Sequence, residues 1–440
     1  MRISSVTMYE QSVSSMNRQQ SDFLKVGQQI ASGRRVVNPS DDPQAASRAV
    51  GVSQAKAVTE QYADARVSAR NTLAQGESVL NSVSDAITSA KTLLVQASSD
   101  TLSDVDRQSV AAELRGIYES LVGQANATDG NGRYLFGGYQ DDSPPFARTS
   151  GDGVEGVKYI GDDNTRAQRI DASRLMPVAD NGETIFRSVP SGAGYVARAE
   201  RDTDAGSSNT IGVQEAEGFF ANSGSVTFKG PSRVNADAAG FGESFRIEFS
   251  VDDTTTPETV SYSALDAAGN AMQDEAGNSV QDVVYESGQT INAAGISITL
   301  EGEPEDGDQI QLRPANADDA NQDLFKSLKD AIDVLEMDQQ GQPENRAHVR
   351  NTLSSTMREL DNSLDNVLTV RASMGARLNE LDVVDAVGGN RMMNYEQTLS
   401  DLVDLDYNEA ISEYSLRQVG LQAAQKAFVD IKGLSLFNFL

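Results

Sequence analysis

Cysteine and tryptophan are absent from this chain of 440 residues, and histidine occurs only once. Without cysteine the chain can form no disulfide, no thiolate metal site and no cysteine nucleophile. Aromatic residues make up only 6% of the sequence. This scarcity disfavours one large globular core and favours long helices packed by Ala, Val and Leu. The length is typical of roughly two to four domains.

The usual sequence signatures of catalysis are also missing. The single histidine, His348, lies in a helical stretch, where a lone histidine is more often a surface or satisfied side chain than a catalyst. No HExxH zinc motif and no P-loop occur. Carboxylate pairs are plentiful, but none has the spacing of an EF-hand loop. We therefore predict no enzymatic activity and no catalytic, cofactor-binding or metal-binding residues, with adventitious calcium binding in the middle of the chain as the remaining alternative.

Negative charge dominates and is concentrated in the middle of the chain. The formal net charge is -29, and residues 141–320 hold 12 basic and 32 acidic residues. Residues 1–140 hold 13 and 14, and residues 321–440 hold 11 and 19. The nearly balanced ends can pack against copies of themselves, whereas the middle should face solvent. Because no basic patch exists, nucleic acid and anionic membranes are disfavoured as partners.

Neither a membrane span nor a cleaved signal peptide is expected. No stretch approaches roughly 18 consecutive apolar residues, and the first residues lack a basic segment followed by an apolar run. If the protein lies outside the cell, it leaves by another route.

Helical periodicity dominates the N-terminal part. Residues 1–32 carry an apolar stripe, and Gly33, Pro39 and Pro43 then interrupt the helix. Asp41 or Asp42 can cap a long helix predicted over 43–99. Its second half has a heptad row with small residues beside it, which is typical of a close-packed coiled coil: Leu73, Leu80, Ile87 and Leu94, with Val83, Ala90 and Ala97. A further helix is predicted over 104–128.

The C-terminal part mirrors this organisation. One heptad row comprises Leu353, Leu360, Val367, Met374 and Leu381. A final helix is predicted near 405–432. We interpret the inner rows as the core of a helical bundle.

The middle of the chain changes character. Gly, Asp, Asn, Thr and Ser dominate its turns, and alternating apolar runs occur at 245–249 and 296–300. Turn signals lie at Gly151-Asp152-Gly153 and Gly307-Asp308. The predicted fold is therefore α+β and multidomain, with a long discontinuous helical coiled-coil bundle from both termini and an inserted β-rich part.

Five segments follow from these patterns. They are a terminal helix and connector (1–42), the N-terminal half of the bundle (43–140), one or two inserted β-rich outer domains (141–320), the C-terminal half of the bundle (321–403) and a C-terminal terminal helix (404–440).

The first and last helices carry the candidate assembly interface. They lie beyond helix-breaking residues, and their apolar stripes need a partner. The stripes, with a period of seven, consist of Tyr9, Met16, Phe23 and Ile30 and of Tyr407, Tyr414, Leu421 and Phe428. We predict packing between subunits, with packing inside one subunit as the alternative. Before assembly these helices should be largely disordered.

Several motifs at both ends resemble the bacterial flagellin family. Ser32-Gly33-Arg34-Arg35-Val36-Val37-Asn38-Pro39-Ser40-Asp41-Asp42-Pro43 looks like the N-terminal flagellin signature. The stretch ending in Gly-Arg-Tyr-Leu-Phe-Gly-Gly at Gly138 is similar to the family's turn after the third helix. Asp404-Leu405-Asp406-Tyr407, with Leu421-Gln422-Ala423-Ala424 further on, resembles its C-terminal helix. These segments cover about 260 residues of the chain.

Within the family, the chain resembles the second of the two hook–filament junction proteins more than the filament-forming flagellins. The features are the start Met1-Arg2-Ile3-Ser4, the run Ser143-Pro144-Pro145-Phe146 and the terminus from Gly433 to Leu440. Pro43-Gln44-Ala45-Ala46 stands where flagellins usually continue with Ala-Gly-Leu.

The resemblance implies a place and partners. It implies an extracellular position at the hook–filament junction and export by the flagellar type III apparatus without signal cleavage. It implies an export chaperone on the C-terminal helix, and contacts with copies of itself, the first junction protein and flagellin. Arg34, Arg35, Asn38, Asp41 and Asp42 lie on the connector, where we expect polar contacts across subunits. A flagellin filament subunit remains the alternative, and an adhesin or an enzyme carried by the insertion is more remote.

Overall fold

The computed structural model describes residues 5–99, 102–151, 154–189, 193–202, 219–254, 258–315, 322–337 and 343–437. It divides into two compact units. The first unit comprises Met1–Val67, Arg169–Arg174 and Leu381–Leu440, and the second unit comprises Ser68–Gln168 and Leu175–Glu380. Both units are therefore assembled from segments that lie far apart in the sequence.

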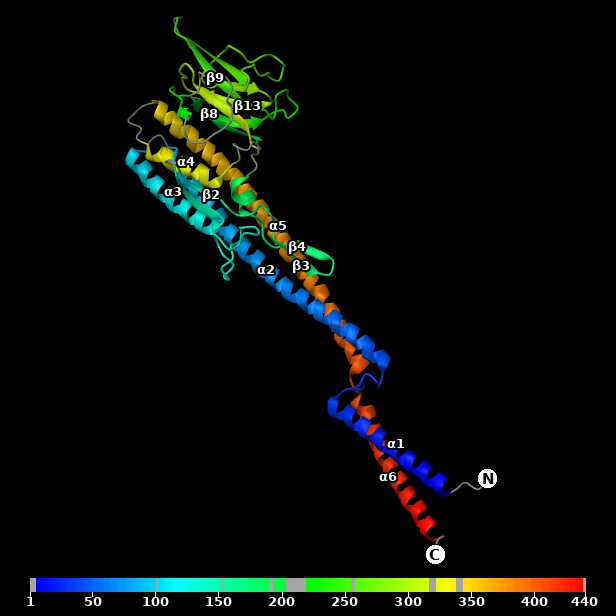
Figure 1. The fold of residues 1–440 in the computed structure, drawn as a ribbon. Coiled ribbons are helices and arrows are strands. Elements are labelled where there is room, and N and C mark those ends of the chain that lie inside the picture. Colours follow the sequence, from blue (N-terminus) through cyan, green and yellow to red (C-terminus); the bar gives the residue numbers. More distant parts are fainter. Residues whose placement is uncertain are drawn as a thin grey trace. The chain divides into compact units, whose positions relative to one another are not determined.

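Six α-helices occur in the described residues, and they follow the predicted order (Figure 1). Their bounds are α1 (Ser5–Ser32), α2 (Pro43–Ala97), α3 (Asp104–Ala125), α4 (Leu324–Glu336), α5 (Pro343–Val403) and α6 (Tyr407–Phe437). The helices predicted over 1–32, 43–99, 104–128 and 405–432 are confirmed, apart from shifts at their ends. Side-chain caps fix several starts. Ser103 and Asp106 form a capping box on α3, and Asp323 accepts hydrogen bonds from the backbone of Phe325 and Lys326 on α4.

The inner heptad rows form the core of the second unit, as predicted. Leu73, Leu80, Ile87 and Leu94 on α2 are fully buried, as are Leu353, Leu360 and Val367 on α5. A Cβ atom at Gly76 would lie 3.4 Å from the Met374 side chain, so α2 and α5 approach closely there. Arg371 and Glu77 add an ion pair between the same two helices at 2.8 Å.

The few aromatic residues are concentrated where α3 and α4 lie side by side (Figure 1). Phe325 of α4 contacts Tyr118, Phe146 and Phe186, with ring centroids 6.2, 5.1 and 5.8 Å apart. Phe136 joins the cluster through Phe186 at 5.7 Å. Edge and tilted ring contacts of this kind stabilise beyond the area that they bury. The aromatic content of the chain is therefore low overall, but it is locally high here and again in the core of the larger sheets, where Tyr195 contacts Phe241 and Phe245.

The strands all lie between residues 146 and 314, within the predicted β-rich middle. Three sheets have two strands each: β1 (Phe146–Gly151) with β2 (Val154–Tyr159), β3 (Ala167–Asp171) with β4 (Arg174–Pro177), and β6 (Glu200–Asp202) with β7 (Phe219–Ala221). Gly151 pairs with Val154 in the first hairpin, whose predicted turn residues Asp152 and Gly153 lie outside the described residues. A π-helical turn covers Glu183–Arg187.

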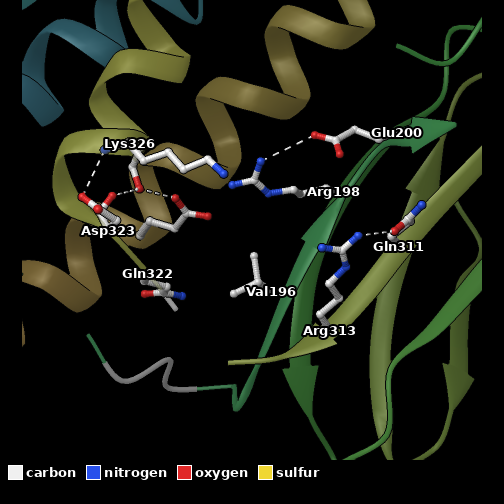
Figure 2. Close-up of a pocket in the computed structure, with 10 residues that line it drawn as sticks. Val196, Arg198, Glu200, Gln311, Arg313, Gln322, Asp323 and Lys326 are labelled. Carbon is white, nitrogen blue, oxygen red and sulfur yellow. Dashed lines mark hydrogen bonds and ion pairs between the residues drawn. The ribbon is translucent and has the colours of Figure 1, made fainter. Parts of the chain in front are cut away.

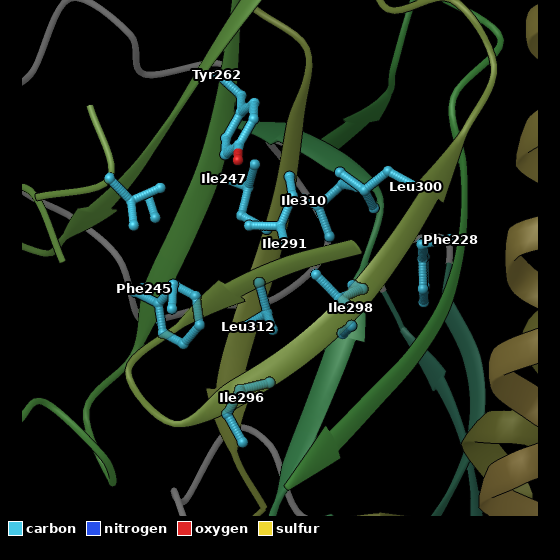
Figure 3. Close-up of a cluster of buried hydrophobic side chains, with 14 of the residues drawn as sticks. Phe228, Phe245, Ile247, Tyr262, Ile291, Ile296, Ile298, Leu300, Ile310 and Leu312 are labelled. Carbon is cyan, nitrogen blue, oxygen red and sulfur yellow. The ribbon is translucent and has the colours of Figure 1, made fainter. Parts of the chain in front are cut away.

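Two larger sheets share one apolar core (Figure 3). The five-stranded sheet has the order β11-β10-β9-β14-β5, and the three-stranded sheet has the order β12-β13-β8. Their bounds are β5 (Tyr195–Arg198), β8 (Thr227–Arg233), β9 (Phe245–Asp252), β10 (Thr259–Asp266), β11 (Val283–Val284), β12 (Thr290–Ala293), β13 (Ile296–Glu301) and β14 (Gln309–Pro314). In β9 and β13 every second side chain enters this core, which confirms the alternation predicted at 245–249 and 296–300.

A buried asparagine joins the three-stranded sheet to α5. The Asn351 side chain accepts a hydrogen bond from the backbone N–H of Phe228 at 3.0 Å and donates one to the carbonyl of Val226 at 2.8 Å. Its amide thus replaces the neighbouring strand that the edge of β8 would otherwise need. The predicted α+β organisation, with helical segments from both ends of the chain and a β-rich insertion, is confirmed.

Candidate assembly interface

The two ends of the chain pair with each other in the first unit. Helices α1 and α6 run antiparallel along their length (Figure 1). Phe23 contacts Tyr414 with ring centroids 4.6 Å apart, and Asp22 forms an ion pair with Arg417 at 3.0 Å. A Cβ atom at Gly27 would lie 3.7 Å from Tyr414. The small residue therefore lets the helices approach closely.

The eight predicted assembly residues have different environments. Met16, Phe23, Ile30, Tyr414, Leu421 and Phe428 are half-buried, Tyr407 is exposed, and the side chain of Tyr9 lies outside the described ones. Tyr407 lies beside Gly33, whose φ of +68° favours glycine and whose Cβ would stand 3.0 Å from the tyrosine hydroxyl. The structure thus brings the two stripes together within one chain. Packing between subunits stays a prediction.

Helix α6 also has an apolar surface that α1 does not cover. Ile411, Leu416, Val419 and Val429 are 54, 71, 63 and 64% exposed. These residues were not predicted, because they lie off the heptad row that begins at Tyr407. The available signal was that α6 carries apolar residues all round its circumference, which is typical of a helix buried in its working state.

The same excess of apolar surface extends over the first unit. The described residues include 22 large apolar side chains that are exposed, and 13 of them lie in this unit. The unit holds fewer than a third of the residues. Such an enrichment of exposed apolar side chains favours an interaction surface in this unit.

The connectors between the helices are held together by backbone and side-chain hydrogen bonds. The backbone N–H of Arg35 donates to the Val403 carbonyl at 2.8 Å, and that of Leu405 donates to the Gly33 carbonyl at 3.1 Å. Arg34 and Asp404 form an antiparallel bridge at the same place. The guanidinium of Arg35 donates to the Leu402 carbonyl at 2.7 Å. The two connectors therefore form a short ladder.

Both aspartates of the connector fix local structure. Asp41 accepts a hydrogen bond from the backbone of Asn38 at 2.9 Å, and Lys25 lies 3.1 Å from it. The Asn38 bond and then Lys25 hold the pKa of Asp41 below its usual value. Asp42 caps α2 through the backbone N–H of Ala45, which lowers its pKa, and Arg35 lowers it further. All five predicted connector residues thus have side-chain or backbone partners within the chain. Their contacts across subunits stay a prediction.

A buried arginine, which sequence periodicity does not predict, supports the first unit. The Arg66 side chain is only 3% exposed; its Nε donates to Asp385 and its Nη1 to the Ile170 carbonyl. Arg391 forms a second ion pair, with Asp171 at 2.9 Å. A Cβ atom at Gly388 would lie 2.6 Å from the Arg66 guanidinium. The only sequence feature that could have indicated this buried contact is Gly388, a glycine inside a long helix.

A small charged pocket in the second unit does not offer a substrate site (Figure 2). It lies between β5, β14 and the helices α4 and α5, and its volume is about 40 Å³, far below the roughly 300 Å³ at which ligand pockets begin. Several of its charged groups have partners: Arg198 pairs with Glu200 at 3.6 Å, and Glu359 accepts a hydrogen bond from Ser327. In the part of the chain that the structure describes, no group of three or more acidic or histidine side chains could hold a metal ion.

No helix among the described residues combines the length and apolar character that a membrane crossing requires.

Comparison with known proteins identifies the class first. Residues 3–141 match the N-terminal helical region of bacterial flagellins. A helical region built from both chain ends and interrupted by a β-rich insertion is the architecture of this class of flagellar structural proteins.

Relatives that match over the full length identify the family. Flagellar hook-associated protein 3 of Escherichia coli (strain K12) is 33% identical over 438 residues, which cover 100% of this chain and 99% of the relative. The protein of the same name from Salmonella typhimurium is 31% identical with the same coverage. The chain belongs to the flagellar hook-associated protein 3 family, whose members are structural, non-enzymatic proteins of the extracellular hook–filament junction.

Solved structures agree with this assignment. FlgL of Xanthomonas campestris is 26% identical, with a TM-score of 0.64 over 79% of this chain and 99% of that one. Hook-associated protein 3 of Legionella pneumophila, at 22% identity and a TM-score of 0.67 over 80% of this chain and 98% of that one, supports the fold alone.

Proposed function

We propose that this chain builds its layer of the flagellar junction by packing the α1–α6 pairs of neighbouring copies against one another. The observation that carries the proposal is the uncovered apolar side of α6, formed by Ile411, Leu416, Val419 and Val429. Each apolar side chain that becomes buried contributes about 1.5–3 kcal/mol. Several such contacts can offset the entropy lost when a subunit is ordered in the assembly.

We expect the flagellar partners to bind the first unit, and the export chaperone to bind α6. Copies of the same chain, the first junction protein and flagellin would contact the first unit, because that unit carries most of the exposed apolar side chains. Before export, a chaperone in the cytoplasm would cover α6, since an uncovered apolar helix favours aggregation. The type III apparatus would then export the chain. Residues 141–320, with 12 basic and 32 acidic residues, suit a solvent-facing position.

The proposal is tested by placing a charge on the uncovered side of α6. Leu416→Asp with Val419→Asp should leave the monomer folded, because both side chains are exposed in it. The double variant should fail to restore motility to a strain that lacks the protein. Val105→Asp is the matched control, since Val105 is equally exposed on α3 of the second unit. Normal motility with the double variant would refute the assembly role of this surface.

A further inference from the structure

Arg107, in the first turn of α3, is a buried cation without a side-chain partner among the described residues. Its side chain is only 8% exposed, and its Nε makes no hydrogen bond to any described residue. No described carboxylate forms an ion pair with it either. An isolated buried charge is costly, and such unsatisfied groups are rare in native proteins. Its position at a helix N-terminus adds to the cost, because the helix dipole there is also positive.

Arg107 lines a pocket of about 310 Å³ in the second unit, which we name the arginine pocket. Arg346 and Arg350 line it from the first turns of α5, one helical turn apart on the same face. Ser98 and Thr227 contribute hydroxyl groups from the end of α2 and from β8. The volume falls within the range of small-molecule pockets, roughly 300–1,000 Å³.

The charge of the arginine pocket is opposite to that of the chain. Among the described residues no aspartate or glutamate lines it, although the chain has 65 acidic residues against 36 basic ones. Arg350 has an electrostatic partner, since it lowers the pKa of Glu301, although the hydrogen bond with Lys229 lowers that pKa first. Arg107 is therefore the buried cation of the pocket that has no side-chain partner among the described residues.

The ends of two helices also line the pocket. The N-terminus of α5 begins at Pro343, which lines the pocket, and contributes positive potential. The C-terminus of α2 at Ala97 and Ser98 contributes partial negative charge, which offsets only part of three guanidinium groups.

We propose that the arginine pocket binds an oxyanion group, a phosphate or a carboxylate, with Arg107 as its buried anchor. Guanidinium groups bind both anions through paired, charge-assisted hydrogen bonds. The two sources of such a group are a dissolved anion and a carboxylate side chain of a second copy of this chain, which is rich in them.

The test titrates the full-length chain with inorganic phosphate, at ionic strength held constant with sodium chloride. Phosphate should raise the melting temperature by about 2–4 °C well above its dissociation constant, with a further rise that follows the logarithm of its concentration. Arg107→Met should weaken phosphate binding at least about tenfold. Without phosphate this variant should be no less stable than the parent, because it removes an unpaired buried charge. Arg115→Met is the control: Arg115 lies on the same helix, pairs with Glu336 at 2.7 Å and does not line the pocket.

Sedimentation of the same proteins separates the two sources. If a second copy supplies the anion, the chain should self-associate in chloride, and both phosphate and Arg107→Met should weaken that association. If a dissolved anion is the ligand, sedimentation should not depend on phosphate while the thermal response remains. The proposal is overturned if phosphate does not raise the melting temperature and no association depends on Arg107. Equal losses in the Arg107 and Arg115 variants would also overturn it, since they would indicate general charge screening.

Discussion

Phe23 and Tyr414 stand 391 positions apart in the sequence, yet their ring centroids lie 4.6 Å from each other. This aromatic pair stabilises the first unit, because it packs α1, near the start of the chain, against α6, near its end.

Replacing one ring should loosen α1 from α6. For Phe23→Ala we expect a loss of about 1–2 kcal/mol, since the ring is only half-buried. Hydrogen exchange over α1 measures the effect and should become faster. Leu24→Ala is the control, because the neighbouring Leu24 is exposed. Equal acceleration in both variants would show that the ring contact contributes nothing specific.

Removing Arg66 should destabilise the first unit more than removing an exposed lysine. Arg66→Met leaves Asp385 and the Ile170 carbonyl without their donor. We expect a cost of about 1–3 kcal/mol, because Asp385 is partly exposed. Lys56→Met breaks the exposed pair with Glu396 and should cost less than about 1 kcal/mol. Calorimetry of the full chain measures both.

Gly388→Ala provides an independent check of the same contact. The new Cβ would meet the Arg66 guanidinium at 2.6 Å and displace it from Asp385. The calorimetric change should therefore resemble that of Arg66→Met. A stabilised Gly388→Ala variant would contradict the contact, since alanine otherwise favours a helix.

Asn351 should be required for the attachment of β8 to α5. Asn351→Leu leaves the Phe228 N–H and the Val226 carbonyl without partners in a buried place, at a cost of about 2–4 kcal/mol. Asn351→Asp keeps the acceptor but sets a carboxylate against the Val226 carbonyl, so it should fail to rescue. Thermal unfolding measures the loss, with Ser354→Ala on the same helix as the control. The interpretation is wrong if Asn351→Leu unfolds at the parent's temperature.

The single histidine provides a clean probe of pH. Burial lowers the pKa of His348 below 6.5, and Glu200 opposes that shift more weakly. Near pH 6.5 the imidazole of His348 therefore binds a proton in the unfolded chain but not in the folded chain. The contribution of His348 to stability thus decreases as the pH falls from about 6.5 toward the folded pKa.

His348→Gln should remove that component of the pH dependence. Comparing the melting temperatures of the two proteins between pH 7.5 and 5.5 measures it, and the imidazole resonance of the parent reports the folded pKa directly. A folded pKa above 6.5 would reverse the sign of the effect and contradict the burial of His348.

Sequence periodicity predicted the elements of this fold well, because helices and strands repeat their apolar residues locally. The rows from Leu73 to Leu94 and from Leu353 to Val367 are buried as predicted, and so are the alternating residues of β9 and β13. Motifs at both ends of the chain predicted the family.

Single long-range contacts could not be predicted in the same way. The pairing of Arg66 with Asp385, the insertion of Asn351 beside β8 and the unpartnered state of Arg107 each involve one residue with no repeating pattern. The exposed residues of α6 were missed for another reason. A heptad row describes the side that packs on one partner, and Leu416 and Val419 lie off that row.

The antiparallel pairing of α1 and α6 has a mechanical consequence. The start of α1 and the end of α6 lie at the same end of the pair, since Phe23 meets Tyr414 while Gln19 meets Gly420. A force that separates the two chain ends therefore breaks one contact after another, as in opening a zipper, and never has to break all of them at once. Pulling this pair apart from its ends should need little force, whereas a load applied across its whole length meets all of the contacts together.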